Sequence, residues 1–313
     1  MAGERRTPNG WHRAVPLRKY TTIRIGGPAA YLTKVRTVEE LVRAVEQAYR
    51  QGIPYRVIGR GSNLVVSDAG FDGLVVVNQT DGISVDPTAD GAVVRAASGT
   101  ALPKLARVTA GLGLTGLEWA VQVPGTVGGA VVNNAGAFGG ATADVLELVE
   151  VFHPKHGRTT WRAEELGLAY RDSRFRRGQA DGWVILAATF RLVRSDPADA
   201  AARLRAAVEH RRRTQPFEPS AGSTFKNPGP EAPAGWLLDR AGLKGAGVGG
   251  VMFSPLHANF IINRGDGTAA DVLALVDLGR REVRARFGID LELEIEFFGA
   301  GFEARREVKL WAG

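Results

Sequence analysis

Three short motifs contain residue types that could stabilise negative charge and donate a proton. Arg171 stands in Tyr-Arg-Asp-Ser, Ser223 stands in Gly-Ser-Thr-Phe-Lys, and Glu294 stands in a run with glutamate at every second position. A planar guanidinium can bind a carboxylate or an enolate through two parallel hydrogen bonds. A serine hydroxyl is a poor acid, so it donates a proton only to a strongly basic, carbanion-like centre. The residues alone favour simpler roles. Arg171 would form an ion pair with Asp172, Ser223 would hydrogen-bond to the backbone in a turn, and Glu294 would face the solvent.

The surroundings of Ser223 bear on the reaction class that it could serve. No Gly-x-Ser-x-Gly motif surrounds this serine, so we do not expect a hydrolase nucleophile. Thr224 next to it carries the same hydroxyl group. The sequence therefore leaves open which of the two residues donates a proton.

Two glycine-rich loops could hold a phosphate-containing cofactor. The loop at residues 59–64 follows a predicted strand, and its glycines allow several N–H groups to approach one anion closely. It is neither a dinucleotide fingerprint nor a P-loop, and alone it favours a tight turn. The loop at residues 124–130 suits a backbone that lies flat against a large planar ligand, and together the two loops favour a long bipartite cofactor such as FAD. The candidate cofactor-binding residues are Gly59, Arg60, Gly61, Ser62, Asn63, Leu64, Pro124, Gly125, Thr126, Gly128, Gly129 and Ala130.

Composition and charge narrow the class of protein. The formal net charge is +7, but the basic residues are spread along the chain without a nucleic-acid-binding motif, so a small anionic ligand accounts for the charge equally well. The absence of cysteine excludes disulfides, thiolate metal sites and cysteine nucleophiles. His153, His156 and His257 lack metal-ligand spacing, so we expect no metal and interpret them as surface residues. No secretion signal and no apolar run near the ~18 residues of a membrane span occur, so we expect a cytoplasmic protein without a membrane segment.

Hydrophobic spacing and capping signals predict the elements that must position these residues. Thr37 and Glu40 form a capping box before apolar residues at helical spacing, and Thr268 caps a late helix that Gly288 ends. The segment 118–140 is rich in glycine but keeps large apolar side chains, so we expect packed backbone rather than a linker. The predicted helices cover residues 38–49, 102–110, 196–213 and 269–287, and the predicted strands cover residues 55–59, 74–77, 92–97 and 289–297.

Seven motifs occur in an order and spacing typical of one enzyme family. They begin at Thr21 (TTIRIGG), Ile58 (IGRGSNLVVSD), Gly116 (GLEWAVQVPGTVGGAVVNNAGAFGG), Tyr170 (YRDSRF), Ser220 (SAGSTFKNP), Ala234 (AGWLLDRAGLKG) and His257 (HANFIIN). On these motifs the chain resembles the UDP-N-acetylenolpyruvoylglucosamine reductase (MurB) family from residue 17 to residue 299. The resemblance covers nearly the whole chain.

The resemblance implies a fold and a cofactor. The expected fold class is α+β, with an FAD-binding fold of the vanillyl-alcohol oxidase type in two lobes and a C-terminal α/β substrate-binding domain. We expect residues 1–78 to form the first lobe, completed by a C-terminal strand at 289–299, residues 79–195 the second lobe and residues 196–288 the substrate-binding domain. Neither loop contains histidine or cysteine, so the FAD is expected to be noncovalent.

The resemblance also implies a reaction in two halves at one flavin. NADPH reduces FAD, and the enolpyruvyl ether of UDP-N-acetylglucosamine then takes the hydride to become UDP-N-acetylmuramate, a peptidoglycan precursor. Arg171 would stabilise the developing negative charge, Ser223 would donate the proton and Glu294 would complete the catalytic set. We expect a role in cell-wall synthesis, cell shape and cell division, without nucleic acid, membrane or an obligate protein partner. The residues expected to bind the nucleotide-sugar are Arg211, Lys226, Asn227 and Asn259.

Two departures and two alternatives qualify this interpretation. Glu296 stands where the family often has arginine, and Tyr170 is the last tyrosine, so the chain resembles a shorter subtype that lacks a tyrosine-bearing insertion. One alternative keeps the flavin fold but makes the protein an oxidase or dehydrogenase of a hydroxy acid or a sugar. The other is a colourless basic binding protein whose affinity falls steeply with salt.

Overall fold

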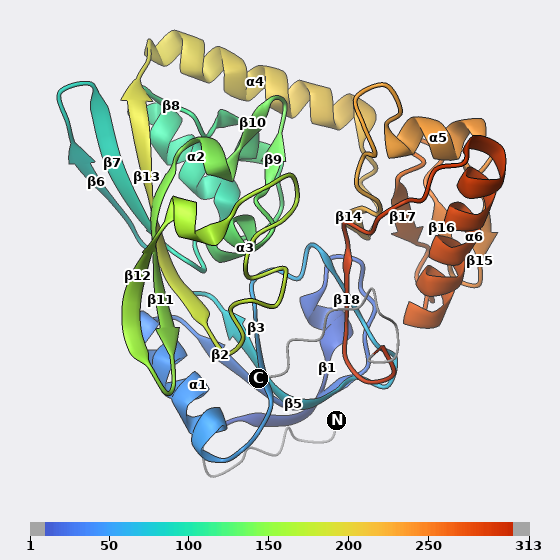
Figure 1. Ribbon diagram of the computed structural model, residues 1–313, viewed down its shortest axis with the longest axis horizontal. Coiled ribbons are helices and arrows are strands. Elements are labelled where there is room, and N and C mark those ends of the chain that lie inside the picture. Colours follow the sequence, from blue (N-terminus) through green and yellow to red (C-terminus); the bar gives the residue numbers. More distant parts are fainter. Residues whose placement is uncertain (1–9, 303–313) are drawn as a thin grey trace. The chain divides into compact units, whose positions relative to one another are not determined.

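The computed structural model describes residues 10–302, and Figure 1 shows the order of the elements along the chain. These residues divide into two units. Unit 1 contains the described residues up to Tyr31, Gly61–Asp72 and the residues from Arg212 onward, whereas unit 2 contains Leu32–Arg60 and Gly73–Arg211. The chain therefore enters each unit more than once. The division into three domains at residues 78 and 195 stays a prediction.

A six-stranded sheet forms the centre of unit 2. Its strands are β6 (Ile83–Pro87), β7 (Gly91–Ala97), β8 (Leu114–Thr115), β11 (Leu146–His153), β12 (Gly157–Arg162) and β13 (Val184–Arg194). The order is β12-β11-β13-β7-β6, and β8 also pairs with β13. Helix α3 (Val127–Val132) lies against β7 and β13, and α2 (Leu102–Gly111) lies against β8. Their apolar side chains join the sheet in one buried core that includes Leu105, Val127 and Phe190.

A second sheet has the order β1-β2-β5-β3. Its strands are β1 (His12–Pro16), β2 (Pro28–Val35), β3 (Tyr55–Ile58) and β5 (Phe71–Asn78), and β3 pairs with β5 in parallel. Helix α1 (Val38–Arg50) connects β2 to β3 and begins at the predicted capping box, in which Thr37 accepts from the Glu40 N–H at 3.1 Å. Strand β3 ends at Ile58, one residue before the predicted limit at Gly59.

Unit 1 contains a four-stranded sheet with the order β14-β17-β16-β15. Its strands are β14 (Ser220–Ser223), β15 (Gly247–Val248), β16 (Val251–Phe253) and β17 (Phe260–Asn263). Helix α6 (Ala269–Phe287) packs on this sheet and on α5 (Ala234–Arg240), as Figure 1 shows. The predicted limits of α6 are confirmed, because Thr268 forms a capping box with Asp271 and Gly288 ends the helix with a φ of 70°. Strand β18 (Glu296–Phe298) pairs in parallel with β4 (Leu64–Val66).

The remaining elements connect these sheets. The glycine-rich segment contains α3 and the short strands β9 (Gly136–Ala137) and β10 (Gly140–Ala141), so the prediction of packed backbone is confirmed. Phe138 at the tip of that hairpin is an exception, since it is 45 % exposed. Helix α4 (Pro197–Thr214) covers the predicted helix at 196–213. No helix within residues 10–302 is both long and apolar enough to cross a lipid bilayer.

The predicted strand at residues 289–297 is wrong over most of its length. The alternation itself is present, since Leu291, Ile295 and Phe297 are each 3 % exposed. However, only Glu296–Phe298 forms a strand. The segment before it is extended, but its hydrogen bonds go to Lys226 and Thr224 rather than along a single partner strand. A period of two therefore identified the buried face but not the pairing partner.

Candidate active site

The two candidate cofactor loops touch each other within unit 2. A Cβ atom at Gly59 would lie 2.5 Å from Oγ1 of Thr126, so only glycine fits there. Thr126 caps α3, and Gly128 donates from its N–H to the Ser98 carbonyl at 2.8 Å. The start of the first loop and the turn of the second are thus held in contact by packing and by the backbone.

The rest of the first loop belongs to unit 1 and is fixed by other contacts. Gly61 has a φ of 61°, and a Cβ atom there would lie 2.2 Å from the carbonyl oxygen of Tyr20. The side-chain amide of Asn63 donates to the carbonyl oxygen of Glu294 at 3.0 Å, and the N–H of Glu296 donates to the carbonyl of Asn63 at 2.8 Å. The loop is therefore bound directly to the segment that carries the candidate catalytic glutamate.

These loops fit the expected cofactor in their chemistry. The protein itself excludes side chains at Gly59 and Gly61, which leaves backbone N–H groups and short polar side chains as donors to a phosphate. Gly129 is exposed, and the atom nearest to a Cβ there would be Thr126 Oγ1 at 3.7 Å, so one side of the second loop is open. Among the candidate cofactor-binding residues of the two loops, Arg60 alone carries a charge, and its side chain is exposed.

Arg171 of unit 2 is held in a defined conformation. It is one of the few non-glycine residues with a positive φ, at 51°, a conformation that costs about 1–3 kcal/mol. Its guanidinium donates to the carbonyl oxygen of Gly136 at 2.6 Å and to that of Asn134 at 3.4 Å, and it lies 5.4 Å from the centre of the Tyr170 ring. The ion pair with Asp172 that the sequence alone favoured is not the one that forms, because Asp172 pairs with Arg177 at 2.8 Å.

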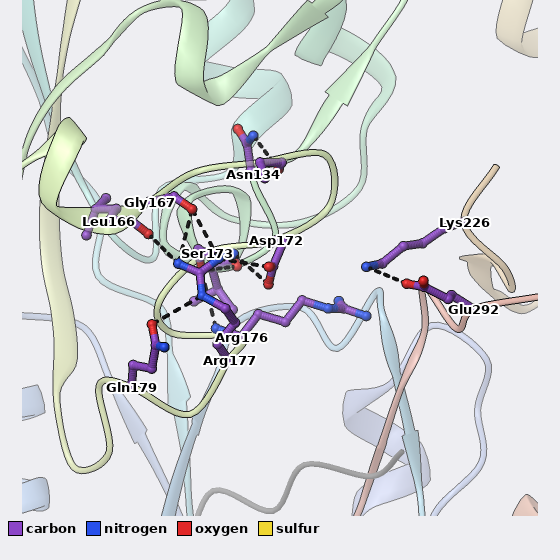
Figure 2. A network of polar contacts seen from close by, with 12 residues as sticks. Asn134, Leu166, Gly167, Asp172, Ser173, Arg176, Arg177, Gln179, Lys226 and Glu292 are labelled. Atoms are coloured by element: carbon purple, nitrogen blue, oxygen red, sulfur yellow. Dashed lines mark hydrogen bonds and ion pairs between the residues drawn. The ribbon is translucent and has the colours of Figure 1, made fainter. Parts of the chain in front are cut away.

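Arg177 organises the loop that carries Arg171, as Figure 2 shows. Besides Asp172, its guanidinium donates to the carbonyl oxygens of Gly167 at 3.1 Å and Leu166 at 3.3 Å. Ser173 adds a hydrogen bond of 2.6 Å from its hydroxyl to the carbonyl of Val132. Arg177 therefore holds the loop together through its hydrogen bonds. Arg174 also contacts the protein, since its guanidinium lies 4.4 Å from the centre of the Trp161 ring.

Asn134 is a site residue that the sequence interpretation missed. It is 6 % exposed, its amide donates to the carbonyl of Ala169 at 2.8 Å, and its side-chain oxygen accepts from the N–H of Ala143 at 3.0 Å. It thus connects the glycine-rich segment to the residue that precedes Tyr170. The sequence did contain one indication of this residue, an Asn-Asn pair shortly before Gly136. Asparagine tolerates a positive φ better than most residues, and Asn134 has a φ of 39°.

Ser223 and Thr224 of unit 1 differ in burial. Ser223 ends β14 and is half-buried, whereas Thr224 is 1 % exposed. The backbone carbonyl of Thr224 accepts from the N–H of Glu294 at 2.9 Å, and its N–H donates to the carbonyl of Asn259 at 2.7 Å. Burial favours Ser223 over Thr224 as the hydroxyl that a bound molecule can reach. Half-buried Glu294 lies on the segment that is hydrogen-bonded to this strand.

The three polar residues expected to bind the nucleotide-sugar in unit 1 have partners within the protein. Lys226 pairs with Glu292 at 3.2 Å (Figure 2), and Asn227 accepts from the N–H of Ala234 at 3.0 Å, at the start of α5. Asn259 is 3 % exposed, and its side chain both accepts from the Phe225 N–H and donates to the Phe225 carbonyl, at 2.9 and 2.8 Å. Both bonds tie its amide to the backbone of Phe225, and its contact with the substrate stays a prediction.

Arg211 of unit 2 differs from these three residues. Burial lowers the pKa of its guanidinium to about 10, and within residues 10–302 that guanidinium has no hydrogen bond or ion pair. Arg211 is half-buried, and a partly desolvated cation without an anion is unfavourable, so its surroundings fit an anionic ligand. The expectation that Arg211 meets the diphosphate agrees with this environment.

Gln215 of unit 1 is a second residue that the sequence interpretation missed. Its side-chain oxygen is buried, and none of the residues described by the structure donates a hydrogen bond to it. A buried acceptor without a donor is costly, so a ligand or a water molecule would satisfy it. Nothing in the sequence separates Gln215 from the polar residues around it, and only the fold marks it.

No cluster suited to a metal ion occurs among the described histidines and carboxylates. Of the three histidines interpreted as surface residues, His156 is exposed, whereas His153 and His257 are half-buried. His153 lies 4.6 Å from His156 and 5.2 Å from Trp183 between ring centres, and burial lowers its pKa. His257 accepts from the Asn259 N–H at 3.2 Å, and burial lowers its pKa as well.

Two protein-family models match the chain. One is described as an FAD binding domain and covers residues 29–161, and the other is described as the C-terminal domain of UDP-N-acetylenolpyruvoylglucosamine reductase and covers residues 214–298. These matches, together with the helices and strands described above, confirm the expected α+β fold with an FAD-binding domain.

Curated and solved relatives match over most of the chain. The UDP-N-acetylenolpyruvoylglucosamine reductase of Chloroflexus aggregans is 42 % identical over 282 residues, which cover 90 % of this chain and 95 % of that protein. The enzyme of the same name from Synechococcus sp. strain CC9311 is 44 % identical and covers 91 % and 92 %. The crystal structure of UDP-N-acetylenolpyruvylglucosamine reductase (MurB) from Thermus caldophilus superposes with a TM-score of 0.75 at 40 % identity, covering 91 % of this chain and 98 % of that chain.

Proposed function

Because the chain belongs to the UDP-N-acetylenolpyruvoylglucosamine reductase family, we propose that it reduces the enolpyruvyl ether of UDP-N-acetylglucosamine to UDP-N-acetylmuramate. It is an oxidoreductase that contains FAD and uses NADPH as reductant. The observation that carries this proposal is the match of relatives with this activity across both the FAD-binding and the C-terminal domains.

The residues divide the chemistry among them. Bound FAD would supply the hydride-transfer chemistry that links NADPH to the methylene carbon of the substrate. Negative charge then develops beside the substrate carboxylate, and Arg171 stabilises it through its guanidinium. Ser223 donates a proton to the carbon next to that carboxylate, which is basic enough to take a proton from a hydroxyl. Glu294 supplies a carboxyl group that can hold or transfer a proton.

Binding of the substrate and the cofactor uses different parts of the chain. The backbone around Gly59, Gly61 and Gly128 holds the FAD pyrophosphate, with Ser62 and Thr126 as hydroxyl donors. Arg211 and Lys226 bind the diphosphate of the nucleotide-sugar, since both carry a charge that a phosphate complements. Asn227 supports this region by capping α5, and Gln215 offers an acceptor to an N–H group of the ligand.

We further propose that the enzyme acts in the cytoplasm, in peptidoglycan precursor synthesis, and that cell shape and division depend on its product. It is proposed to work without nucleic acid, membrane or an obligate protein partner. The reaction needs only FAD, NADPH and the nucleotide-sugar, which supports this view.

The test is to follow the visible spectrum of the purified protein under anaerobic conditions. NADPH should bleach the flavin absorbance, and addition of the enolpyruvyl nucleotide-sugar should restore it with formation of UDP-N-acetylmuramate. A protein that cannot be reconstituted with FAD would contradict the cofactor assignment. A flavin that only oxygen reoxidises would leave the fold assignment intact and contradict the substrate.

A further inference from the structure

The segment that carries Glu294 changes its hydrogen-bonding partner at that residue. On one side, the carbonyl of Glu292 accepts from the N–H of Lys226 at 2.8 Å, and the N–H of Glu294 donates to the carbonyl of Thr224 at 2.9 Å. On the other side, the N–H of Glu296 donates to the carbonyl of Asn63 at 2.8 Å, after which the segment pairs with β4. Glu294 thus lies between the strand that carries Ser223 and the loop that carries Ser62 and Asn63, all within unit 1.

Asn63 holds this junction with its side chain as well as its backbone. Its Nδ2 atom donates to the carbonyl oxygen of Glu294 at 3.0 Å, while its own carbonyl accepts from Glu296. The two bonds bracket Glu294 and Ile295, whose side chain is buried at 3 % exposure. An amide side chain of this length can donate here, whereas an aspartate of the same shape or a leucine of similar size has no donor at neutral pH.

We propose that Asn63 is a positioning residue for Glu294, so that the loop expected to contact the cofactor also sets the place of the catalytic carboxylate. The inference rests on the proposed function. Because Glu294 serves the substrate half of the reaction, loss of the Asn63 donor slows that half. Reduction of the flavin by NADPH does not use the carboxylate and proceeds as before.

The experiment compares Asn63→Leu with a matched variant of the neighbouring loop residue, Ser62→Ala, in the holoenzyme. The rates of flavin reduction by NADPH and of flavin reoxidation by the nucleotide-sugar are measured separately, with the FAD content per chain and the thermal midpoint. With FAD restored to the same content per chain as in the parent, we expect the ratio of the reoxidation rate to the reduction rate to fall about tenfold in Asn63→Leu. Ser62→Ala should change FAD retention and leave the ratio of the two rates unchanged.

A double-mutant cycle tests whether Asn63 acts through Glu294. In a Glu294→Gln background, where the carboxylate is gone but the backbone carbonyl remains, Asn63→Leu should slow reoxidation less than about twofold further. A full tenfold additional loss would overturn the inference, and so would an equal loss of both half-reactions in the single variant. Asn63→Ser, a smaller change, gives the same comparison if the leucine variant does not fold.

Failure of the proposed function would look different. In that case the parent protein itself would not be reoxidised by the nucleotide-sugar, whatever residue stands at position 63. Reoxidation in the parent, together with a reoxidation rate for Asn63→Leu that equals the parent rate, would contradict only the role of Asn63.

Discussion

The guanidinium of Arg171 donates a hydrogen bond of 2.6 Å to the carbonyl oxygen of Gly136, and Arg171 holds this position from a backbone φ of 51°. The backbone of the glycine-rich segment, which is expected to contact the cofactor, therefore also fixes the direction of the candidate catalytic arginine. A guanidinium that is already oriented loses less freedom when it meets a carboxylate. The first predictions concern this arrangement.

Replacing Arg171 by lysine should keep the positive charge but lose the planar pair of donors. We expect reoxidation of the reduced flavin by the nucleotide-sugar to slow by about 10²–10³-fold, as for other oriented donors that stabilise developing charge. FAD content and the rate of reduction by NADPH should stay near the parent values. Arg174→Lys, in the same motif but stacked on Trp161, is the matched control and should slow reoxidation less than about threefold. Equal loss in the two variants would contradict the role of Arg171.

Replacing Asn134 by alanine should release the loop that precedes Arg171. The variant loses the bonds to Ala169 and Ala143 and leaves buried backbone groups unsatisfied, so the free energy of unfolding should fall by about 1–3 kcal/mol. Chemical denaturation with linear extrapolation measures this change. Arg158→Ala serves as the control, because Arg158 is exposed and its ion pair with Glu39 spans 3.8 Å, and it should change the free energy by less than about 0.5 kcal/mol.

Replacing Gly59 by alanine should push the two cofactor loops apart. The new Cβ atom would meet Thr126 Oγ1 at 2.5 Å, so we expect a loss of about 1–3 kcal/mol in stability and weaker retention of FAD. Adding Thr126→Ala removes the clashing atoms, so the double variant should recover part of the FAD affinity. Gly82→Ala, with no atom within 4 Å of the new methyl group, should behave like the parent in thermal unfolding and FAD titration.

Replacing Arg211 by methionine should weaken binding of the nucleotide-sugar without lowering the stability of the protein. Burial lowers the pKa of Arg211 to about 10, so the charged form is disfavoured in the folded state. The unfolded chain holds this proton more tightly than the folded chain does, so the charged guanidinium lowers the stability of the fold. This loss of stability should be relieved as the pH rises above about 10.

The methionine variant should thus be at least as stable as the parent at neutral pH, with the difference shrinking above pH 10. Its KM for the nucleotide-sugar should rise about tenfold or more if the guanidinium meets the diphosphate. Arg212→Met, one position along the same helix and exposed, is the control. If Arg211→Met raised the stability but left the KM for the nucleotide-sugar unchanged, the result would contradict a role of Arg211 in substrate binding.

Elements with local signals could be predicted from the sequence, and long-range contacts could not. Helices α1 and α6 begin at capping boxes and end near glycine, and such signals act within a few residues. The segment before β18 alternates as a strand does, yet its partners lie about 70 and 230 residues earlier in the chain, which a local pattern does not encode. The same reason hid the hydrogen bonds of Asn259 to the backbone of Phe225, which lies 34 residues earlier in the chain.

The pairing of β18 with β4 has a consequence for synthesis of the protein. Residues 64–66 leave the ribosome long before residues 296–298, so the parallel partner of β4 is made about 230 residues later. The contact between Ser67 and Ala300, at 2.6 Å, forms at the same late stage. Until then the loop with Asn63 has no glutamate to hold, so a nascent chain stalled before this point has an unfinished unit 1. Glu294, the candidate catalytic glutamate, can therefore reach its place beside Asn63 only about 230 residues after that loop has been made, because this contact is distant in sequence.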